Sequence, residues 1–194
     1  MNRAHQKLTA WQNTQKPLIG LWVKPELIKM PLPIQRFDDP FLPFGRAIFQ
    51  ATQDLISVYI LDLASYFALG APGIIALERT IAMIAVSESA VLLHGPFWGT
   101  DFLPALSDHA LNVDAATLVR SEDRAFYDSI MIESVMYQPQ AEIASTPTLS
   151  KTHLWLQVGE GLAHIETYGA ELTETARGED FAEVIRATLL KLRV

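Results

Sequence analysis

The stretch Ala51–Phe102, ATQDLISVYILDLASYFALGAPGIIALERTIAMIAVSESAVLLHGPFWGTDF, carries the clearest fold signal in the chain. Within it, SVYILDL at 57–63 is a continuous β-rich run, which is typical of a strand buried on both faces. SYFAL predicts a short helix, and the break Ala71-Pro72-Gly73 precedes the helical pattern IIALERTIAMIA. VLLHG then predicts another strand. These residues indicate two consecutive strand and helix units of a parallel sheet.

The same alternation continues on both sides of this stretch. LIGLWV at 18–23 predicts a first buried strand, FGRAIFQATQDLI at 44–56 an amphipathic helix, and NVDAATLV at 112–119 a fourth strand. SEDRAFYDSI then predicts a helix with Ser121 as its N-cap. Because strand and helix alternate four times, we expect an α/β fold with parallel strands covered by outer helices.

The N-terminal part holds a helix and a proline-rich loop. Residues 1–16 predict a helix or tail, in which Asn2–Gln15 is the helical part. Residues 24–43 contain five prolines, and their spacing forbids a continuous helix. We therefore expect a long surface loop between the first strand and the first covering helix.

The C-terminal part gives a weaker signal. IMIESVMY at 130–137 fits a strand or a helix end, and Gln138–Lys151 predicts a polar loop. HLWLQVGEGLAHIETYG at 153–169 predicts one or two strands, and FAEVIRATLLKLRV at 181–194 predicts an amphipathic helix. Because the length fits one core, we expect residues 1–194 to form a single domain.

Composition excludes several classes of function. The 194 residues include 15 basic and 22 acidic side chains, a net charge of −7, with no cluster of Lys and Arg, so nucleic-acid binding is not expected. The absence of cysteine excludes disulfides, thiolate metal sites and a cysteine nucleophile. No apolar run approaches the roughly 18 residues of a membrane span, and no secretory signal is evident. We expect a soluble protein of the cytoplasm or an organelle matrix.

These elements and several of their residues resemble orotidine 5′-phosphate decarboxylase, particularly the divergent bacterial-type branch of that family. The resemblance runs from about Leu8 to Val119. It includes Gly20-Leu21, the helix Ser65-Tyr66-Phe67 with the turn Leu69-Gly70, and the run Asp114-Ala115-Ala116-Thr117. It implies a TIM-barrel-like (β/α) repeat. Since a complete eightfold barrel usually takes about 200 residues or more, we expect a minimal or incomplete barrel.

The positions that would carry decarboxylase chemistry depart from the family pattern. Trp22 replaces the acidic residue of the family's Gly-Leu-Asp-Pro motif, and Ile60 stands where the family has a lysine. At the third strand the family has Asp-x-Lys-x-x-Asp, whereas this chain has His94-Gly95-Pro96. The family's reaction needs lysine and aspartate groups that stabilise charge and deliver a proton, which isoleucine and proline do not supply. The resemblance therefore implies a catalytically degenerate homologue.

Three polar side chains remain as candidate site residues: His94, Asp101 and Asp62. They lie at or just after predicted strand ends, where barrel enzymes place their chemistry. His94 is either a general base or ligand, or a structural histidine. Asp101 is the residue that would stand in for a missing acid. Asp62 either points into a pocket or, as we favour, caps the helix that begins near Ser65.

Aromatic residues near the predicted strand ends have two interpretations. Trp22, Phe97 and Trp98 would stack on a planar ligand or, as we favour, fill the barrel mouth or face a protein partner.

A metal centre is not expected. Asp108 and His109 with His94 and Asp101 form a conceivable ligand set, but their spacing matches no compact motif. We expect neither a metal nor another cofactor.

The expected function is that of a non-catalytic relative of orotidine 5′-phosphate decarboxylase, a structural or interaction subunit with a protein partner or a second copy of itself. One alternative is a nucleotide-like small-molecule binder, or a carbon–carbon lyase of altered chemistry, that uses His94, Asp101 and Asp62. Another is a true decarboxylase with lysines from elsewhere, for which Lys24 and Lys29 are the nearby candidates.

Overall fold

The computed structural model describes residues 3–97, 99–107, 110–118, 120–129, 133–136, 151–158, 161–168 and 176–192. Trp98, Asp108 and His109 lie outside these residues, as do 138–150 of the predicted polar loop. The helices are α1 (Arg3–Asn13), α2 (Phe41–Thr52), α3 (Leu63–Phe67), α4 (Ala71–Ala85), α5 (Leu103–Ser107), α6 (Arg124–Ser129) and α8 (Phe181–Leu192). The strands are β1 (Ile19–Val23), β2 (Val58–Asp62), β3 (Ala90–Phe97), β4 (Ala115–Leu118), β5 (Glu133–Met136), β6 (Lys151–Val158) and β7 (Gly161–Tyr168).

The strands of the described residues form one sheet in the order β5-β4-β3-β2-β1-β7-β6. β1 to β5 are parallel, and β7 pairs in parallel with β1 on its other side. A closed barrel has its last strand beside its first, so β7 occupies that place, while β5 and β6 are the two ends of the sheet. The prediction of an α/β fold with an incomplete TIM-barrel-like repeat is confirmed.

One strand departs from the all-parallel expectation. β6 pairs antiparallel with β7 along its whole length, from Lys151 opposite Tyr168 to Val158 opposite Gly161. The two strands follow one another too closely in sequence for the crossover that a parallel pair requires. The segment at 153–169 therefore supplies two strands, which was one of the two options left open by its sequence.

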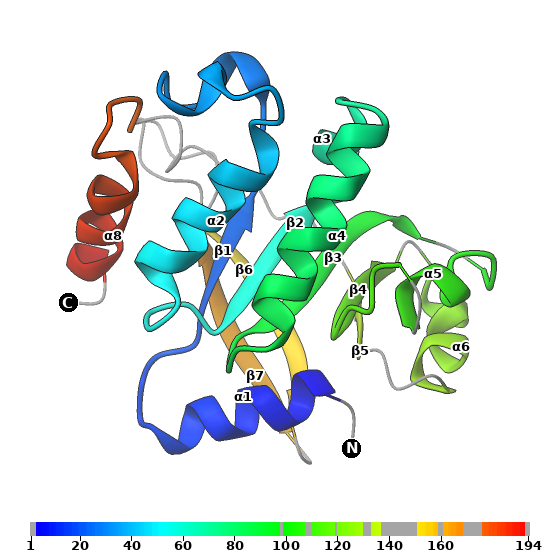
Figure 1. Ribbon diagram of the computed structural model, residues 1–194. Helices are drawn as coiled ribbons and strands as arrows, with labels where there is room; N and C mark the ends of the chain where they lie inside the picture. The colour runs from blue at the N-terminus through cyan, green and yellow to red at the C-terminus, as the bar shows by residue number, and fades with distance from the viewer. Residues whose placement is uncertain are drawn as a thin grey trace.

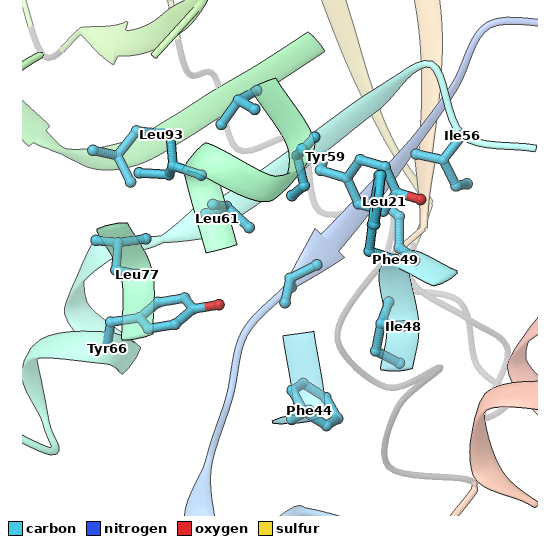
Figure 2. Packing of buried hydrophobic residues seen from close by; sticks show 14 of the residues in the cluster. Leu21, Phe44, Ile48, Phe49, Ile56, Tyr59, Leu61, Tyr66, Leu77 and Leu93 are labelled. Atoms are coloured by element: carbon cyan, nitrogen blue, oxygen red, sulfur yellow. The ribbon is translucent and has the colours of Figure 1, made fainter. Parts of the chain in front are cut away.

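Helices cover the outer face of the sheet (Figure 1). Outward side chains of the strands pack against α2 and α4, and Figure 2 labels several of them: Leu21, Tyr59, Leu61 and Leu93 from the strands, and Phe44, Ile48, Phe49 and Leu77 from the helices. Because the inner face of these strands is also covered, β2 is apolar along nearly its whole length.

Helix α1 closes the amino ends of the strands (Figure 1). Its buried stripe contributes Ala4 and Leu8 to an inner apolar cluster, whose strand members are Val58, Ile60, Ala90, Leu92, Ala115 and Ile165. The inner space is therefore filled by side chains at its amino end. Barrel enzymes place their active sites at the opposite, carboxyl end of the strands.

The proline-rich segment is shorter than predicted. It forms 3₁₀ turns at Leu27–Lys29 and Ile34–Arg36, and α2 begins at Phe41, so the predicted loop at 24–43 is wrong over its last three residues. Pro43 fits in the first helical turn because the backbone N–H groups there have no helical partner to lose.

The helix that follows β4 also begins differently. A 3₁₀ turn, Ser121–Asp123, precedes α6, and its N-cap is Arg120, so the prediction of Ser121 as N-cap is wrong. Asp123 is buried and accepts hydrogen bonds from the Arg120 guanidinium at 2.8 and 3.0 Å and from Gly99 N–H at 2.8 Å. These contacts hold the turn and tie it to the loop after β3.

Candidate functional site

The carboxyl ends of β1 to β4 meet at one edge of the sheet because the strands are parallel. Alternate residues of each strand face the inner space, and near this edge they are Trp22, Asp62, His94 and Thr117. The register places Asp62 directly opposite His94. This edge is where barrel proteins hold their ligands, and it brings together two of the three predicted candidates.

His94 is held by two side chains from neighbouring parts of the sheet. Its Nδ1 lies 3.1 Å from Oγ1 of Thr117 in β4. The Trp22 ring of β1 meets it edge to face, with ring centroids 5.0 Å apart and planes at 78°. Partial burial lowers the pKa of His94 from its usual value, the positive charge of Lys24 acts in the same direction, and Asp62 opposes them. Partial burial of the imidazole therefore favours its neutral form.

Trp22 bridges the inner space. Its Nε1 donates a hydrogen bond of 3.3 Å to Oγ1 of Thr167 in β7, while its ring contacts His94 of β3. Beside it, Gly20 lies so close to Thr167 that an added Cβ would meet the threonine Cγ2 at 2.7 Å. Trp22 therefore lies across part of the mouth, between β7 and β3.

Ile60 forms the apolar floor of this region. Its side chain has no exposed surface and belongs to the inner cluster formed with α1. Pro96 lies in β3, two residues beyond His94. Phe97 is buried in the outer core, where its ring meets Phe102 at 5.2 Å, so it does not plug the mouth.

Asp62 has a local structural role. Its Oδ1 accepts a hydrogen bond of 3.2 Å from Ser65 N–H, so it is the N-cap of α3. This is the capping arrangement that its position before Ser65 favoured. Its charge still acts on His94 across the paired strands.

Asp101 is not gathered with the other two candidates. It is exposed in the loop between β3 and α5, and no hydrogen bond between described residues joins it to His94 or Asp62. The loop itself is anchored elsewhere, through Gly99 N–H and Asp123.

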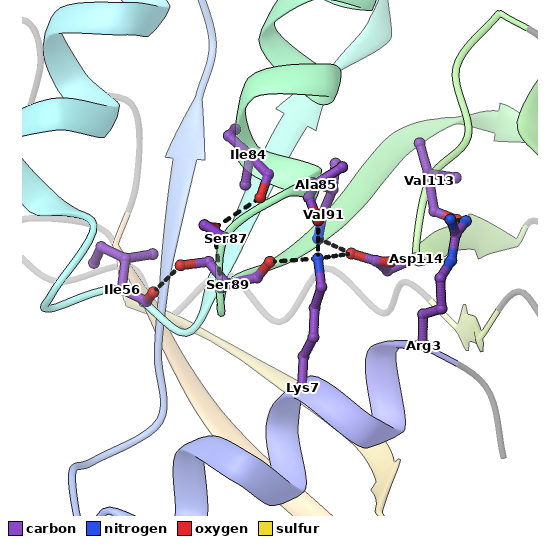
Figure 3. Close-up of polar contacts among 10 residues, drawn as sticks. All are labelled: Arg3, Lys7, Ile56, Ile84, Ala85, Ser87, Ser89, Val91, Val113 and Asp114. Carbon is purple, nitrogen blue, oxygen red and sulfur yellow. Dashed lines mark hydrogen bonds and ion pairs between the residues drawn. The ribbon is translucent and has the colours of Figure 1, made fainter.

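Asp114 lies at the other end of the barrel, although it belongs to the same sequence motif as Thr117. It is buried just before β4, where Oδ2 accepts hydrogen bonds of 2.9 Å from Lys7 Nζ and from Val91 N–H (Figure 3). Arg3 Nε lies 3.4 Å from its Oδ1. Asp114 therefore fastens α1 to the sheet, and Thr117 alone of this motif reaches the candidate site.

A cavity of about 560 Å³ also lies toward the amino ends of the strands, away from the candidate residues. Its lining includes Lys16, Glu88 and the ion pair of Asp54 with Arg186. The arginine holds the pKa of Asp54 below its usual value, chiefly through this hydrogen bond. Charges of both signs therefore line this cavity, and two of them, on Asp54 and Arg186, form an ion pair with each other.

Among the described residues, no group of three or more His, Cys, Asp or Glu side chains is placed to hold a metal ion. Among the same residues, no helix has the length and apolar character of a bilayer span.

The sequence interpretation missed Thr117 and Thr167 as partners of His94 and Trp22. Thr117 was visible within its motif, but its contact with a histidine 23 residues away depends on the β3 and β4 register. Thr167 is 145 residues from Trp22, and nothing in the local sequence of either residue indicates the other.

Comparison with known proteins identifies the scaffold. No family model matches the chain. Orotidine 5′-phosphate decarboxylase of Parabacteroides distasonis is 26% identical over 161 residues, which cover 82% of this chain and 53% of the relative. The enzyme of that name from Herpetosiphon aurantiacus is 35% identical over 118 residues, which cover 58% of this chain and 43% of the relative. The chain thus spans about half the length of the curated relatives it matches.

A solved structure gives the same result for the fold. A Streptomyces avermitilis protein, provisionally named an orotidine 5′-phosphate decarboxylase, superposes with a TM-score of 0.57 at 16% identity, over 72% of this chain and 55% of that one. At this identity the likeness shows the fold alone. Together with the sequence relatives, it identifies the chain as a distant homologue of orotidine 5′-phosphate decarboxylase over most of its length.

Proposed function

We propose that this decarboxylase-like chain does not decarboxylate orotidine 5′-phosphate and serves as a structural or interaction subunit. The observation that carries the proposal is Ile60, which is fully buried in an apolar cluster at the position where the resemblance implies a lysine. A lysine ammonium delivers a proton to a carbanion, and an isoleucine side chain has no such proton. The apolar neighbours of Ile60 also offer no partner for a charge.

The neighbouring strands support the same proposal. His94 and Pro96 stand in β3 where the resemblance implies an aspartate and a lysine, and His94 is engaged by Thr117 and Trp22. Catalysis of this decarboxylation depends on charged groups preorganised around the reacting carbon. A neutral imidazole beside an indole does not reproduce that field.

A direct assay tests the loss of catalysis. Purified chain is incubated with orotidine 5′-phosphate, and release of carbon dioxide is measured, with the Parabacteroides distasonis enzyme as positive control. Circular dichroism and a cooperative thermal transition verify that the chain is folded. We expect no release above the uncatalysed rate. Enzymatic turnover would overturn the proposal. Loss of that turnover in Lys24→Met or Lys29→Met would then identify the lysine that replaces the one missing at position 60.

The interaction role is supported by apolar side chains exposed near the carboxyl end of the barrel. Ile28 and Phe37 of the proline-rich segment are 78% and 54% exposed, and Phe67 at the end of α3 is 61% exposed. Exposed large apolar side chains are a feature of protein contact sites where they form a contiguous patch.

Light scattering of the purified chain tests self-association as one form of this role. We expect a dimer or larger species, weakened in Ile28→Glu. Val86→Glu is the matched control. Val86 is 89% exposed at the C-terminal end of α4, so its substitution should leave the assembly unchanged. A monomer at all concentrations would exclude self-association and leave an unrelated protein as the partner.

A second candidate function is the binding of a small molecule at the carboxyl edge. It is favoured by the convergence there of His94, Asp62 and Thr117, with the charge of Lys24 acting on His94. Titration calorimetry with orotidine 5′-phosphate tests it, with His94→Gln as the comparison variant. Binding that weakens in the variant supports a site at this edge. No heat at millimolar ligand would contradict a nucleotide site.

A further inference from the structure

The cavity near the amino ends of the strands is lined by residues from the C-terminal ends of α1, α2 and α4 and from α8. Its volume of about 560 Å³ lies within the range of small-molecule pockets, which is about 300–1,000 Å³. None of the candidate residues at the carboxyl edge of the sheet lines it. It is therefore a second place in the fold where a ligand could be held.

Two positive and two negative side chains line this cavity, and only some of these charges are used within the protein. Asp54 and Arg186 form an ion pair. Lys16 and Glu88 form no ion pair or side-chain hydrogen bond with other described residues. The Lys16 ammonium instead lies 5.3 Å from the centroid of the Trp11 ring. One cation and one anion of the cavity are therefore available to a ligand.

The turn after α1 carries the available cation. The Trp11 Nε1 donates a hydrogen bond of 3.3 Å to the carbonyl oxygen of Pro17, which holds the backbone on both sides of Lys16. The pKa of Asp54 is lowered chiefly by its hydrogen bond with Arg186, and the charge of Lys16 adds to this effect. The positive charge of Lys16 therefore acts within the cavity, where it would attract the carboxylate of a ligand.

The turn between α4 and β3 carries the available anion. Ser87 Oγ donates to the carbonyl oxygen of Ile84 at 2.7 Å and accepts from Ser89 N–H at 3.1 Å, which fixes this turn (Figure 3). Glu88 lies two residues beyond Val86, the C-cap of α4. Because the C-terminal end of a helix carries a partial negative charge, it adds to the attraction of Glu88 for an ammonium group.

We propose that this cavity binds a small zwitterion with the chemistry of an amino acid or a dipeptide, whose ammonium pairs with Glu88 and whose carboxylate pairs with Lys16. A ligand with negative charge alone would also meet the carboxylates of Asp54 and Glu88, and a ligand with positive charge alone would meet Lys16. A zwitterion satisfies both available charges. The side-chain amides of Gln50 and Gln53 supply donors and acceptors for the peptide group of a dipeptide.

NMR of the nitrogen-15-labelled chain, titrated at neutral pH with millimolar alanyl-alanine, tests the proposal. We expect saturable shifts of backbone amides around the cavity, such as those of Gln53 and Ser87. N-acetyl-alanyl-alanine lacks the ammonium, and alanyl-alanine amide lacks the carboxylate. Each should bind about fivefold more weakly than the dipeptide, as the loss of one exposed ion pair implies.

Two variants assign the two ends of the ligand. Lys16→Met should weaken binding of alanyl-alanine about fivefold without weakening binding of the amide, which has no carboxylate to pair. Glu88→Gln should weaken binding of alanyl-alanine to the same extent without weakening binding of the N-acetyl form. Glu78→Gln is the matched control, since Glu78 is exposed on α4 and does not line the cavity. It should bind all three compounds as the wild type does.

Three outcomes would overturn the proposal. One is the absence of saturable shifts at the cavity with alanyl-alanine. Another is equal affinity for the dipeptide and its two blocked forms. The third is a loss of affinity in Glu78→Gln as large as that in Glu88→Gln, because net charge alone would then explain the effect. None of these outcomes depends on whether the chain binds or decarboxylates orotidine 5′-phosphate.

Discussion

Lys7 of α1 and Asp114 before β4 form a hydrogen-bonded ion pair of 2.9 Å between residues 107 positions apart. The same Lys7 Nζ donates to the carbonyl oxygens of Ala85 and Ser89 at 3.0 and 2.9 Å (Figure 3). One ammonium thus joins the N-terminal helix to the end of α4, the turn before β3 and the start of β4. This contact holds α1 over the amino ends of the strands.

Lys7→Met should destabilise the fold by about 3 kcal/mol, because it leaves the Asp114 carboxylate buried and, among the described residues, with only the half-exposed Arg3 as a charged partner. Lys29→Met is the control, since Lys29 pairs with Glu26 at the surface and its loss should cost less than about 1 kcal/mol. Urea unfolding followed by circular dichroism measures both. Equal effects in the two variants would contradict the special role of the buried pair.

Gly20→Ala should destabilise the barrel by about 1–3 kcal/mol, because the new methyl group would overlap Thr167 Cγ2. Thr167→Ser removes that methyl group and keeps the hydroxyl that accepts from Trp22. The double variant should therefore lose less stability than the sum of the two single variants. Additive losses in thermal unfolding would show that the close approach of β1 and β7 is not the cause.

Asp62 combines a cap and a charge, and two substitutions separate them. Asp62→Ala removes the acceptor for Ser65 N–H and should cost about 1 kcal/mol, whereas Asp62→Asn keeps an acceptor and should cost much less. Asp62→Asn should also lower the pKa of His94, since the aspartate charge favours the imidazolium. Chemical denaturation and an NMR titration of His94 measure the two effects. A raised pKa in Asp62→Asn would contradict this electrostatic assignment.

Acid should weaken the fold through His94. Its pKa in the folded protein lies below the unfolded value of about 6.5, so the unfolded state binds the proton first as the pH falls. The free energy of unfolding should therefore decline as the pH falls from about 6.5 to the pKa of His94 in the folded protein. Below that pKa, protonation of His94 should cause no further decline. Denaturation of wild type and His94→Gln between pH 5 and 8 tests this. The variant should have the shallower slope, and identical slopes would refute the effect.

Local pattern was sufficient to predict most elements. In the stretch from β2 to β3, the strands are continuous apolar runs and the long helix has apolar residues at helical spacing. These strands and helices could therefore be placed from the sequence. The predictions were wrong where contacts between side chains determine the residue at which an element begins. The turn Ser121–Asp123 depends on the ion pair between Arg120 and Asp123. Asp123 also accepts a hydrogen bond from the N–H of Gly99, which lies 24 residues earlier in the chain.

For the candidate site, the sequence by itself determined the residue types: isoleucine, proline and tryptophan where the resemblance implies charged groups. Those identities limit the available chemistry whatever the fold. Only the tertiary structure decided that His94 and Asp62 meet while Asp101 stays apart, and that Thr117 and Trp22 hold the histidine. The physical reason is that parallel register and alternating side-chain direction bring together residues from separate strands, and no local sequence pattern encodes that pairing.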